Sequence, residues 1–353
     1  MLVHGKPRGE ADAPSEEANA RDPWRWRRAA ALLAGCLVAL PAKAGDPLTL
    51  IVSGMDKQIY LPVRLADRLG YFKDADIDVE LLSEEAGVNA RDQLLLGHVE
   101  GVVGFYDHTI DLQAKGKQVE SVVQFTRAPG EALVVPVRAA RRIASVEDLR
   151  NQAVGVTGVG SSTDYLARYL LLSRGARPGE VTTLGVGSAG SFTAALASGR
   201  ILAGMTSEPT VSTLVRSGQA RILVDLRTPS KSEAVLGGPY PGACLYMSTA
   251  WVRTHKPLVR RLAAAFVKAL RFIATHDAEE VARAAGPEAP GLDKAAYVAG
   301  MRETKSAFTA DGRMPPSGPA TVVKVLRLSD NAVGNKAIDV ARTWTDEFVG
   351  AVR

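Results

Sequence analysis

The sequence predicts an α/β protein with two lobes, each built on a mainly parallel sheet flanked by helices, around a cleft. Three observations support this fold class. Short apolar runs of strand length alternate with amphipathic runs of helix length from about residue 48 onward. Only a few residues connect these runs, as in parallel strands joined by helices, and the rhythm occurs twice. With 353 residues, of which 46% are hydrophobic, the chain is long enough for two or three domains.

The first α/β unit starts with a strand over residues 48–53, "LTLIVS". A helix follows from Leu61, because Pro62 suits the first helical turn and Gly70 suits a helix end. The alternating apolar residues of 77–82, "IDVELL", predict a half-buried strand. The unit continues with a short helix over 92–96, a strand over 99–105, a helix over 108–116 with Asp107 as its N-cap, and a strand over 119–125.

The second unit repeats this pattern and then gives way to helices. Strands are expected over 131–137, 153–157, 181–186, 201–206 and 220–226, and helices up to Leu172, over 192–197 and after Pro209. A Gly- and Pro-rich stretch, 236–244, precedes a long helix over 257–275, and further helices continue to the C-terminus. Because strands cross between the units near 125–133 and 223–229, we expect one lobe from 45–128 plus 229–353 and the other from 129–228.

The N-terminal 44 residues have the outline of a signal peptide with a long n-region. Arginines precede the apolar run 29–40, and the A-x-A sequence at 42–44 predicts cleavage before Gly45. The run is too short for a transmembrane helix. Residues 33–36, "LAGC", also match a lipobox that would lipidate Cys36, and the Arg27-Arg28 pair is compatible with twin-arginine export. The true start codon could also lie downstream of Met1.

The charge and cysteine content exclude two classes of protein. The net charge is +5, but residues 1–44 hold seven Lys or Arg and five Asp or Glu, so the rest keeps 36 basic against 33 acidic residues. These basic residues are scattered, which argues against a nucleic-acid partner. Cys244 is the only cysteine after Cys36, so the mature chain has no internal disulfide and depends on its core.

The stretch 155–165, "GVTGVGSSTDY", lies where a strand becomes a helix. It is not a Walker loop, because no lysine occurs between Lys117 and Lys231, and its glycine spacing is wrong for a dinucleotide fingerprint. Two interpretations remain open. Free amides at the helix start can bind an anion or another hydrogen-bond acceptor, or Ser161 and Asp164 can cap the helix as a near capping box.

Other polar residues give weaker signals for chemistry. Asp107 and His108 adjoin at a helix start, where Asp107 is explained as a cap, so an acid/base pair is disfavoured. No cysteine, histidine and carboxylate cluster indicates a metal site, and no G-x-S-x-G indicates a serine nucleophile. Glu208 follows a strand. It either stabilises the next helix through its dipole or accepts a hydrogen bond from a ligand amine or ring N–H.

Residues 60–82, "YLPVRLADRLGYFKDADIDVELL", resemble the start of exported solute-binding proteins of the sulfonate, taurine, nitrate and pyrimidine-precursor type, the NMT1/THI5-like family. The resemblance continues through "SVEDLRNQAVGVTGVGSSTDYLARYLL", "SAGSFTAALASGRILAGMTSEPTVSTL" and the late "DGRM". It implies a type II periplasmic-binding fold, the permease of an ABC importer as partner, and a strand-end loop with Phe105, Tyr106 and His108 at the ligand. Fungal pyrimidine-building enzymes of this family carry a Cys-rich segment that is missing here.

The sequence and its resemblance to this family predict a monomeric periplasmic protein that closes over a sulfonate, a carboxylate or a pyrimidine-like heterocycle for an ABC importer, without cofactor, metal or catalysis. A ligand sensor that signals to a receptor and a pyrimidine-synthase-like enzyme are the alternatives. The loops at the carboxyl ends of the strands are where a ligand is expected. The candidate ligand-binding residues are Ser53, Met55, Asp56, Phe105, Tyr106, His108, Gly158, Gly160, Ser161, Ser162, Thr163, Gly187, Ser188, Ser191 and Glu208.

Overall fold

The computed structural model describes residues 45–286 and 293–350, all of which belong to one compact unit, Lys43–Arg353. The signal peptide expected over residues 1–44, the lipobox cysteine Cys36 and the Arg27-Arg28 pair lie outside the described residues. None of the helices in the described part of the chain is both long and apolar enough to cross a bilayer.

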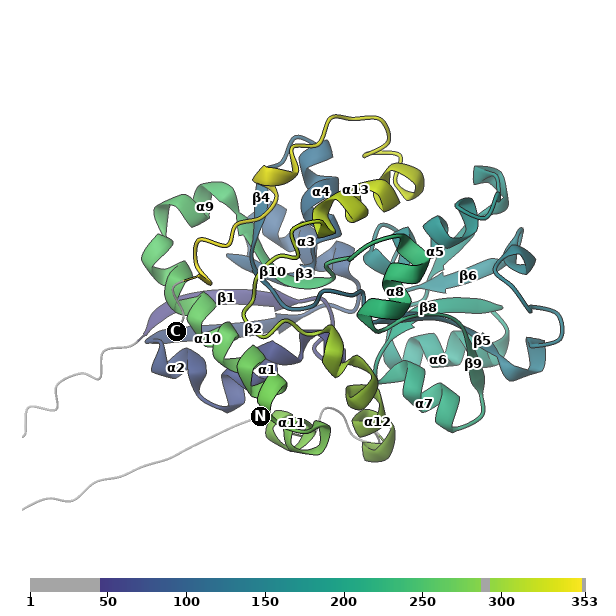
Figure 1. Ribbon diagram of the computed structural model, residues 1–353, viewed down its shortest axis with the longest axis horizontal. Helices are drawn as coiled ribbons and strands as arrows, with labels where there is room; N and C mark the ends of the chain where they lie inside the picture. Colours follow the sequence, from purple (N-terminus) through teal and green to yellow (C-terminus); the bar gives the residue numbers. More distant parts are fainter. Residues whose placement is uncertain (1–44, 287–292, 351–353) are drawn as a thin grey trace, which may run out of the picture. The chain divides into compact units, whose positions relative to one another are not determined.

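The first of two five-stranded sheets has the strand order β2-β1-β3-β10-β4. Its strands are β1 (Asp46–Val52), β2 (Ile77–Ser83), β3 (Gly101–Phe105), β4 (Val119–Gln124) and β10 (Ala243–Ser248). Strands β1, β2 and β3 are parallel, and β10 runs antiparallel between β3 and β4. The last strand in the sequence therefore inserts into a sheet that the first hundred residues begin (Figure 1).

The second sheet is built in the same way, with the order β7-β6-β8-β5-β9. Its strands are β5 (Glu131–Pro136), β6 (Ala153–Val156), β7 (Thr182–Gly185), β8 (Ala203–Ser207) and β9 (Ala220–Leu226). Here β6, β7 and β8 are parallel, while β5 runs antiparallel to both of its neighbours. The chain passes between the sheets after β4 and after β9, and each crossing leads into the antiparallel strand.

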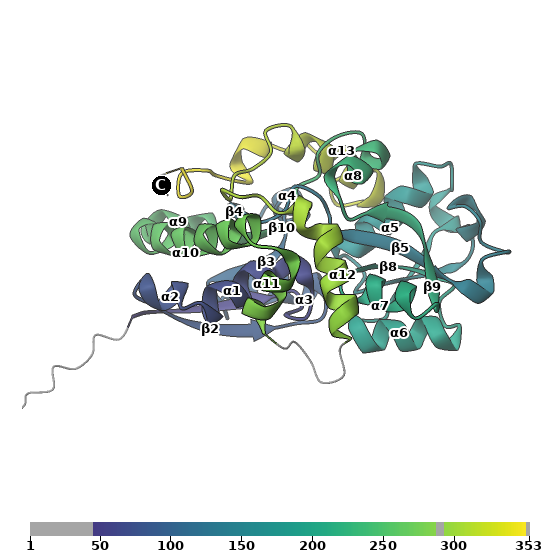
Figure 2. The same cartoon turned by 60° about the horizontal axis from the view of Figure 1, so that its bottom comes forward.

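Helices cover both faces of both sheets (Figures 1 and 2). They are α1 (Leu61–Arg68), α2 (Tyr71–Asp74), α3 (Gly87–Leu96), α4 (Asp107–Ala114), α5 (Ser162–Leu172), α6 (Ala189–Ser198), α7 (Thr210–Arg216), α8 (Pro229–Leu236), α9 (Thr249–Thr254), α10 (Lys256–Thr275), α11 (Ala278–Ala285), α12 (Lys294–Thr304) and α13 (Gly318–Ser329). In the first sheet, α1 and α10 cover one face, and α3 and α4 cover the other. In the second sheet, α5 and α6 lie on opposite faces.

The side chains of strand β5 point alternately into two different hydrophobic clusters of the core. Leu133 and Val135 point into a hydrophobic cluster that continues under α5 and α13 to the back of the first sheet. Ala132 and Val134 point to the opposite face, toward α6 and α7. Because successive side chains of a strand alternate, one strand joins two apolar layers. The C-terminal helix α13 packs on α5, and α12 packs on α7, so late segments of the chain contact the second sheet.

The predicted α/β fold class is confirmed, but both sheets are mixed instead of mainly parallel, because β10 and β5 run antiparallel to both of their neighbours. Other details also differ. Strand β10 has no counterpart in the prediction, because all but its last residue are buried and it therefore shows no alternation after its Gly- and Pro-rich approach. The expected N-cap role of Asp107 is wrong. Tyr106 occupies the cap position of α4, and Asp107 is the first helical residue, buried, where it accepts a hydrogen bond from the Tyr240 hydroxyl at 3.2 Å.

Candidate binding site

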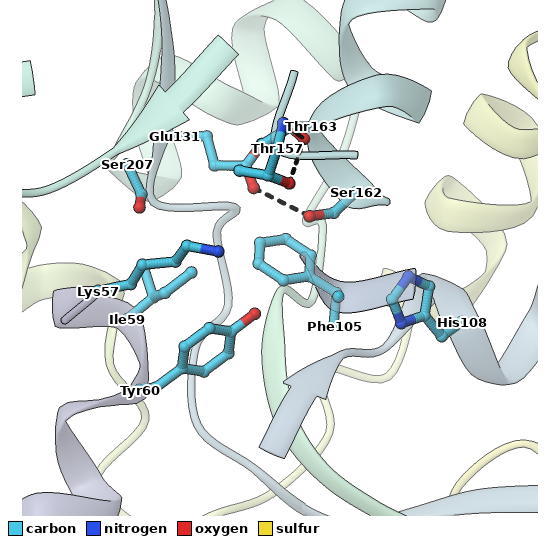
Figure 3. Close-up of a pocket in the computed structure, with 11 residues that line it drawn as sticks. Lys57, Ile59, Tyr60, Phe105, His108, Glu131, Thr157, Ser162, Thr163 and Ser207 are labelled. Atoms are coloured by element: carbon cyan, nitrogen blue, oxygen red, sulfur yellow. Dashed lines mark hydrogen bonds between the residues drawn. The ribbon is translucent and has the colours of Figure 1, made fainter. Parts of the chain in front are cut away.

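A small cavity lies where the carboxyl ends of strands from both sheets meet the amino end of β5 (Figure 3). From the first sheet's connections it is lined by Lys57, Ile59, Tyr60, Gly87, Phe105 and His108, and from the second sheet by Glu131, Thr157, Ser162, Thr163 and Ser207. The space open to a water-sized molecule is about 10 Å³, which suffices for about one water. An organic solute can enter only after the two walls separate.

Lys57 supplies a buried ammonium to this cavity from the loop after β1. Its Nζ donates to the carbonyl oxygen of Ser53 at 2.6 Å and to that of Glu85 at 2.7 Å. An ammonium has three donors, so these bonds use two of them. Burial lowers the pKa of Lys57, while the nearby carboxylates of Asp56, Glu131 and Glu85 act in the opposite direction.

Glu131, the first residue of β5, faces the cavity from the second sheet. Its Oε1 accepts a hydrogen bond from the Ser162 hydroxyl at 3.0 Å. Its Oε2 is buried and has no hydrogen-bond partner among the described residues. Burial raises the pKa of Glu131 to about 8, so the carboxyl is mostly protonated at neutral pH in this environment.

His108 is a neutral imidazole at the edge of the cavity. Its Nδ1 lies 3.2 Å from the Tyr246 hydroxyl, and its buried Nε2 has no hydrogen-bond partner within the described part of the chain. Burial, reinforced by the Arg91 guanidinium, lowers the pKa of His108 to about 3. The neighbouring Asp107 carboxyl has its pKa raised to about 8 by burial, and its Oδ1 lies 4.0 Å from His108 Nε2. At this distance, and with opposite shifts of their pKa values that keep both groups neutral, His108 and Asp107 do not form an acid/base pair.

The glycine-rich turn and the first residues of α5 contribute three hydroxyl residues to the cavity wall, Thr157, Ser162 and Thr163. The Thr163 hydroxyl accepts from the Thr157 amide at 3.0 Å, which fixes the turn, and Ser162 points toward Glu131. Self-capping accounts for only part of the sequence pattern. Asp164 does accept from the Gly160 amide at 2.8 Å, whereas Ser161 makes no capping bond and accepts from the Val88 amide of α3 at 3.2 Å.

Gly158 marks a close approach between this turn and the first sheet's connections. A Cβ atom there would lie 2.9 Å from the Ala86 Cβ, a distance that side chains do not adopt. The glycine is therefore explained by packing between the two sides of the site. Gly158, Gly160 and Ser161 do not line the cavity themselves.

The start of α6 holds a carboxylate of the protein itself. The Glu85 carboxylate, from the loop after β2, accepts from the Ser188 amide at 3.4 Å and from the Ser191 hydroxyl at 3.3 Å. A side chain on Gly187, which has φ +75°, would collide with the same carboxylate. These three predicted ligand contacts thus lie around the Glu85 carboxylate, to which Ser188 and Ser191 donate hydrogen bonds.

Glu208 is buried beside the cavity and lies in a closed network. Its Oε1 accepts from Arg227 at 2.6 Å and from the Ser212 hydroxyl at 3.0 Å, and its Oε2 accepts from the Ser212 amide at 2.9 Å. Its neighbour Ser207 lines the cavity instead. The carboxylate of Glu208 therefore has internal partners, and the expectation that it contacts a ligand finds no support in this arrangement.

Four of the predicted site residues line the cavity: Phe105, His108, Ser162 and Thr163. The remaining candidates from the first unit lie nearby but outside its lining. Ser53 is buried under Lys57, Met55 and Asp56 are half-buried, and the Tyr106 hydroxyl turns away to bond with Thr343. Contact with a ligand stays a prediction for every one of these residues.

Sequence reasoning missed the two charged residues of the cavity, Lys57 and Glu131, and the aromatic Tyr60. Lys57 directly follows the predicted Asp56. The expectation that a ligand lies at the carboxyl ends of the strands therefore pointed to the correct loop. Glu131 begins a strand that runs antiparallel, so its amino end lies at the edge where its neighbours have their carboxyl ends. No group of three or more His, Cys, Asp or Glu side chains that could hold a metal ion occurs in residues 45–286 and 293–350.

Comparisons with known proteins agree with this architecture. The NMT1/THI5-like family model matches residues 59–280. A solved protein of Bordetella bronchiseptica RB50 is 31% identical, with 87% of this chain and 96% of that chain covered and a TM-score of 0.81. No curated protein matches the chain.

Two more distant structures share the fold. The alkanesulfonate-binding protein SsuA from Xanthomonas axonopodis pv. citri, bound to MOPS, is 18% identical, with 86% and 99% of the two chains covered and a TM-score of 0.66. The ligand-binding component of an ABC-type import system from Staphylococcus aureus, with zinc bound, is 12% identical, with coverage of 87% and 99% and a TM-score of 0.67. At these identities the likeness concerns the fold.

Proposed function

Because the chain belongs to the NMT1/THI5-like family, we propose that it is a periplasmic solute-binding protein that delivers a small organic molecule to the permease of an ABC importer. The proposed solute is a sulfonate, a carboxylate or a pyrimidine-like heterocycle, and the protein acts as a monomer. Structural neighbours named as ligand-binding components of import systems or as sulfonate- and nitrate-binding proteins support this role.

The observation that carries the proposal is a cavity with one wall from each sheet. A molecule held there touches Lys57 and Phe105 on one side and Glu131 and Ser162 on the other. Contacts to both walls exist only when the walls are close together, so a bound solute favours the closed arrangement. A permease can then distinguish the loaded protein from the empty one by its shape.

Closure requires two bodies that move relative to each other. We propose residues 45–128 plus 229–353 as one lobe and 129–228 as the other, with the hinge in the two crossings after β4 and β9. The contact of α13 with α5 and the bond between Val88 and Ser161 would form on closing and break on opening. Only a few loop residues need to change their backbone angles in such a hinge.

Replacement of Ser162 by Trp tests the proposed site. An indole at this buried position is far larger than the cavity of about 10 Å³ and holds the walls apart. We expect Ser162→Trp to abolish binding of solutes from a metabolite extract in native mass spectrometry, with the melting temperature of the ligand-free protein changed by only a few degrees. Ser198→Trp, at an exposed position at the far end of α6, is the matched control and should bind normally. Binding that survives Ser162→Trp would contradict this location of the site.

A further inference from the structure

An amine and a carboxyl face the same enclosed cavity without pairing. Lys57 belongs to the loop after β1, and Glu131 belongs to β5 of the other sheet. Each influences the other electrostatically, yet no ion pair joins them in the described residues. Figure 3 shows the Lys57 amine, the Tyr60 hydroxyl and the Glu131 carboxyl pointing toward the same small space beside the Phe105 ring.

Each of the two groups has unused hydrogen-bonding capacity on its cavity side. Glu131 is 2% exposed, and its Oε2 has no donor within the described part of the chain. Lys57 is 8% exposed and uses two of its three donors on carbonyl oxygens. Buried polar groups of this kind are normally satisfied, so unused capacity beside a cavity indicates where a ligand supplies the partner.

The pair selects solutes by charge distribution. A solute with only an anionic group would leave Glu131 Oε2 without a donor, and one with only a cationic group would place a positive charge beside Lys57. A molecule with both groups can bring a donor to Glu131 and an acceptor to Lys57 together. The apolar surfaces of Ile59 and Phe105 suit a short carbon skeleton between them.

We propose that the solute is a small zwitterion, whose cationic nitrogen is bound by Glu131 and whose anionic oxygen group is bound by Lys57. This inference rests on the solute-binding role proposed above and narrows it. It also moves the recognition of a ligand nitrogen from Glu208, whose oxygens are taken by Arg227 and Ser212, to Glu131.

The protonation of Glu131 gives the inference a signature in pH. The titratable and charged groups around this carboxyl are Lys57, Tyr60, Asp107 and Tyr240, and its pKa is raised to about 8. A cationic nitrogen requires the ionised carboxylate, so binding releases the proton. Affinity should therefore rise by about tenfold per pH unit from pH 6 to about pH 8. A solely anionic solute would instead favour the protonated carboxyl and bind more tightly at low pH.

The test uses matched sets of small molecules with the full mature protein. Short ω-amino carboxylates and aminosulfonates are the zwitterions. The corresponding hydroxy acids are the anions, and the corresponding amino alcohols are the cations. Binding is screened by thermal shift and measured by calorimetry between pH 6 and pH 8, where the aliphatic amines stay protonated. We expect binding by zwitterions only, with proton release.

Two variants separate recognition from folding. Glu131→Gln keeps the shape and the bond from Ser162 but loses the charge, so it should weaken zwitterion binding by about 10- to 100-fold at pH 8 and remove the rise with pH. Asp107→Asn changes a nearby buried carboxyl outside the cavity lining and should keep the rise.

Three outcomes would overturn the inference. Anions that bind as well as zwitterions, or an affinity that Glu131→Gln leaves unchanged, would refute the zwitterion and leave the solute-binding role intact. Failure of every molecule in the sets, together with a metabolite extract, to bind the wild-type protein would contradict the solute-binding role itself.

Discussion

Glu131 and Glu208 lie side by side at one edge of the second sheet but have opposite surroundings. Across the β5–β8 ladder Glu131 is paired with Ser207, the residue before Glu208. Both side chains are buried, and burial raises the pKa of both. Glu208 has an arginine and two bonds from Ser212, whereas Glu131 has one hydroxyl and an unpaired oxygen. The number of internal partners, not the residue type, decides which carboxyl is available to a solute.

The hydrogen bonds around Glu208 explain why its carboxylate is not available to a solute. Arg227 bonds to Glu208 through Nη1 and to both oxygens of Asp225, at 2.9 Å each, through Nε and Nη2. The guanidinium and Lys231 lower the pKa of Asp225 to about 2. The planar arginine fork can serve two carboxylates at once, which the Lys57 ammonium across the cavity does not do.

Removal of Arg227 should have the largest effect of the changes considered. Arg227→Met leaves Glu208 buried without its counter-charge, so the free energy of unfolding should fall by about 3–5 kcal/mol. Chemical denaturation measures this loss. Arg216→Met, at an exposed position of α7, is the control and should change stability by less than about 0.5 kcal/mol. Equal effects of the two substitutions would show that the Glu208 network does not stabilise the fold.

Ionisation of Glu131 should lower the stability of the ligand-free protein, whereas the ion pair of Glu208 raises it. Its folded pKa of about 8 lies above that of an unfolded glutamate, so the folded state holds a proton that the unfolded state releases as the pH rises. Stability from this group is therefore present at low pH and is lost between about pH 4.5 and pH 8. Asp107, also raised to about 8, contributes in the same direction.

Thermal denaturation at several pH values checks this contribution. We expect Glu131→Gln to leave the melting temperature unchanged or higher at pH 8 and to reduce its decline between pH 5 and pH 8. Asp107 maintains part of the decline in this variant. A decline as steep in Glu131→Gln as in the wild-type protein would mean that Glu131 is already ionised in the folded state and that its pKa is not raised.

Glu85 is a third glutamate at the site, exposed and held by long bonds, so its removal should have the smallest effect. Its bonds to Ser188 and Ser191 join the loop after β2 to the start of α6. Because exposed contacts of this kind contribute little, Glu85→Ala should weaken solute binding by about two- to fivefold. Calorimetry measures the change, with the adjacent Glu84→Ala as control. A loss as large as that of Glu131→Gln would place Glu85 in contact with the solute.

Much of the fold could be predicted because periodicity and helix-end signals are local. The strand over 77–82 and the helix from Leu61 follow from alternation and from Pro62 and Gly70. Strand β10 could not be predicted from the sequence. It lacks alternation, and its place between β3 and β4 depends on residues more than a hundred positions earlier.

The site shows the same division between local and distant information. The expectation that a ligand lies at the carboxyl ends of the strands pointed to the segments around Phe105, His108, Ser162 and Thr163, which line the cavity. Which glutamate is available to a ligand could not be predicted from the sequence. Glu208 pairs with Arg227, 19 positions later, whereas Glu131 accepts a hydrogen bond only from Ser162, 31 positions later. Hydrogen-bond partners of buried carboxyls are set by the tertiary structure.

A crystal structure of the protein with the solute that it binds most tightly tests directly whether Glu131 and Lys57 bind that solute. We expect a molecule between the two sheets, with a nitrogen within hydrogen-bond distance of Glu131 Oε2 and an oxygen within hydrogen-bond distance of Lys57 Nζ. A solute bound elsewhere, or one that contacts Glu208 while Glu131 keeps only Ser162, would contradict this expectation.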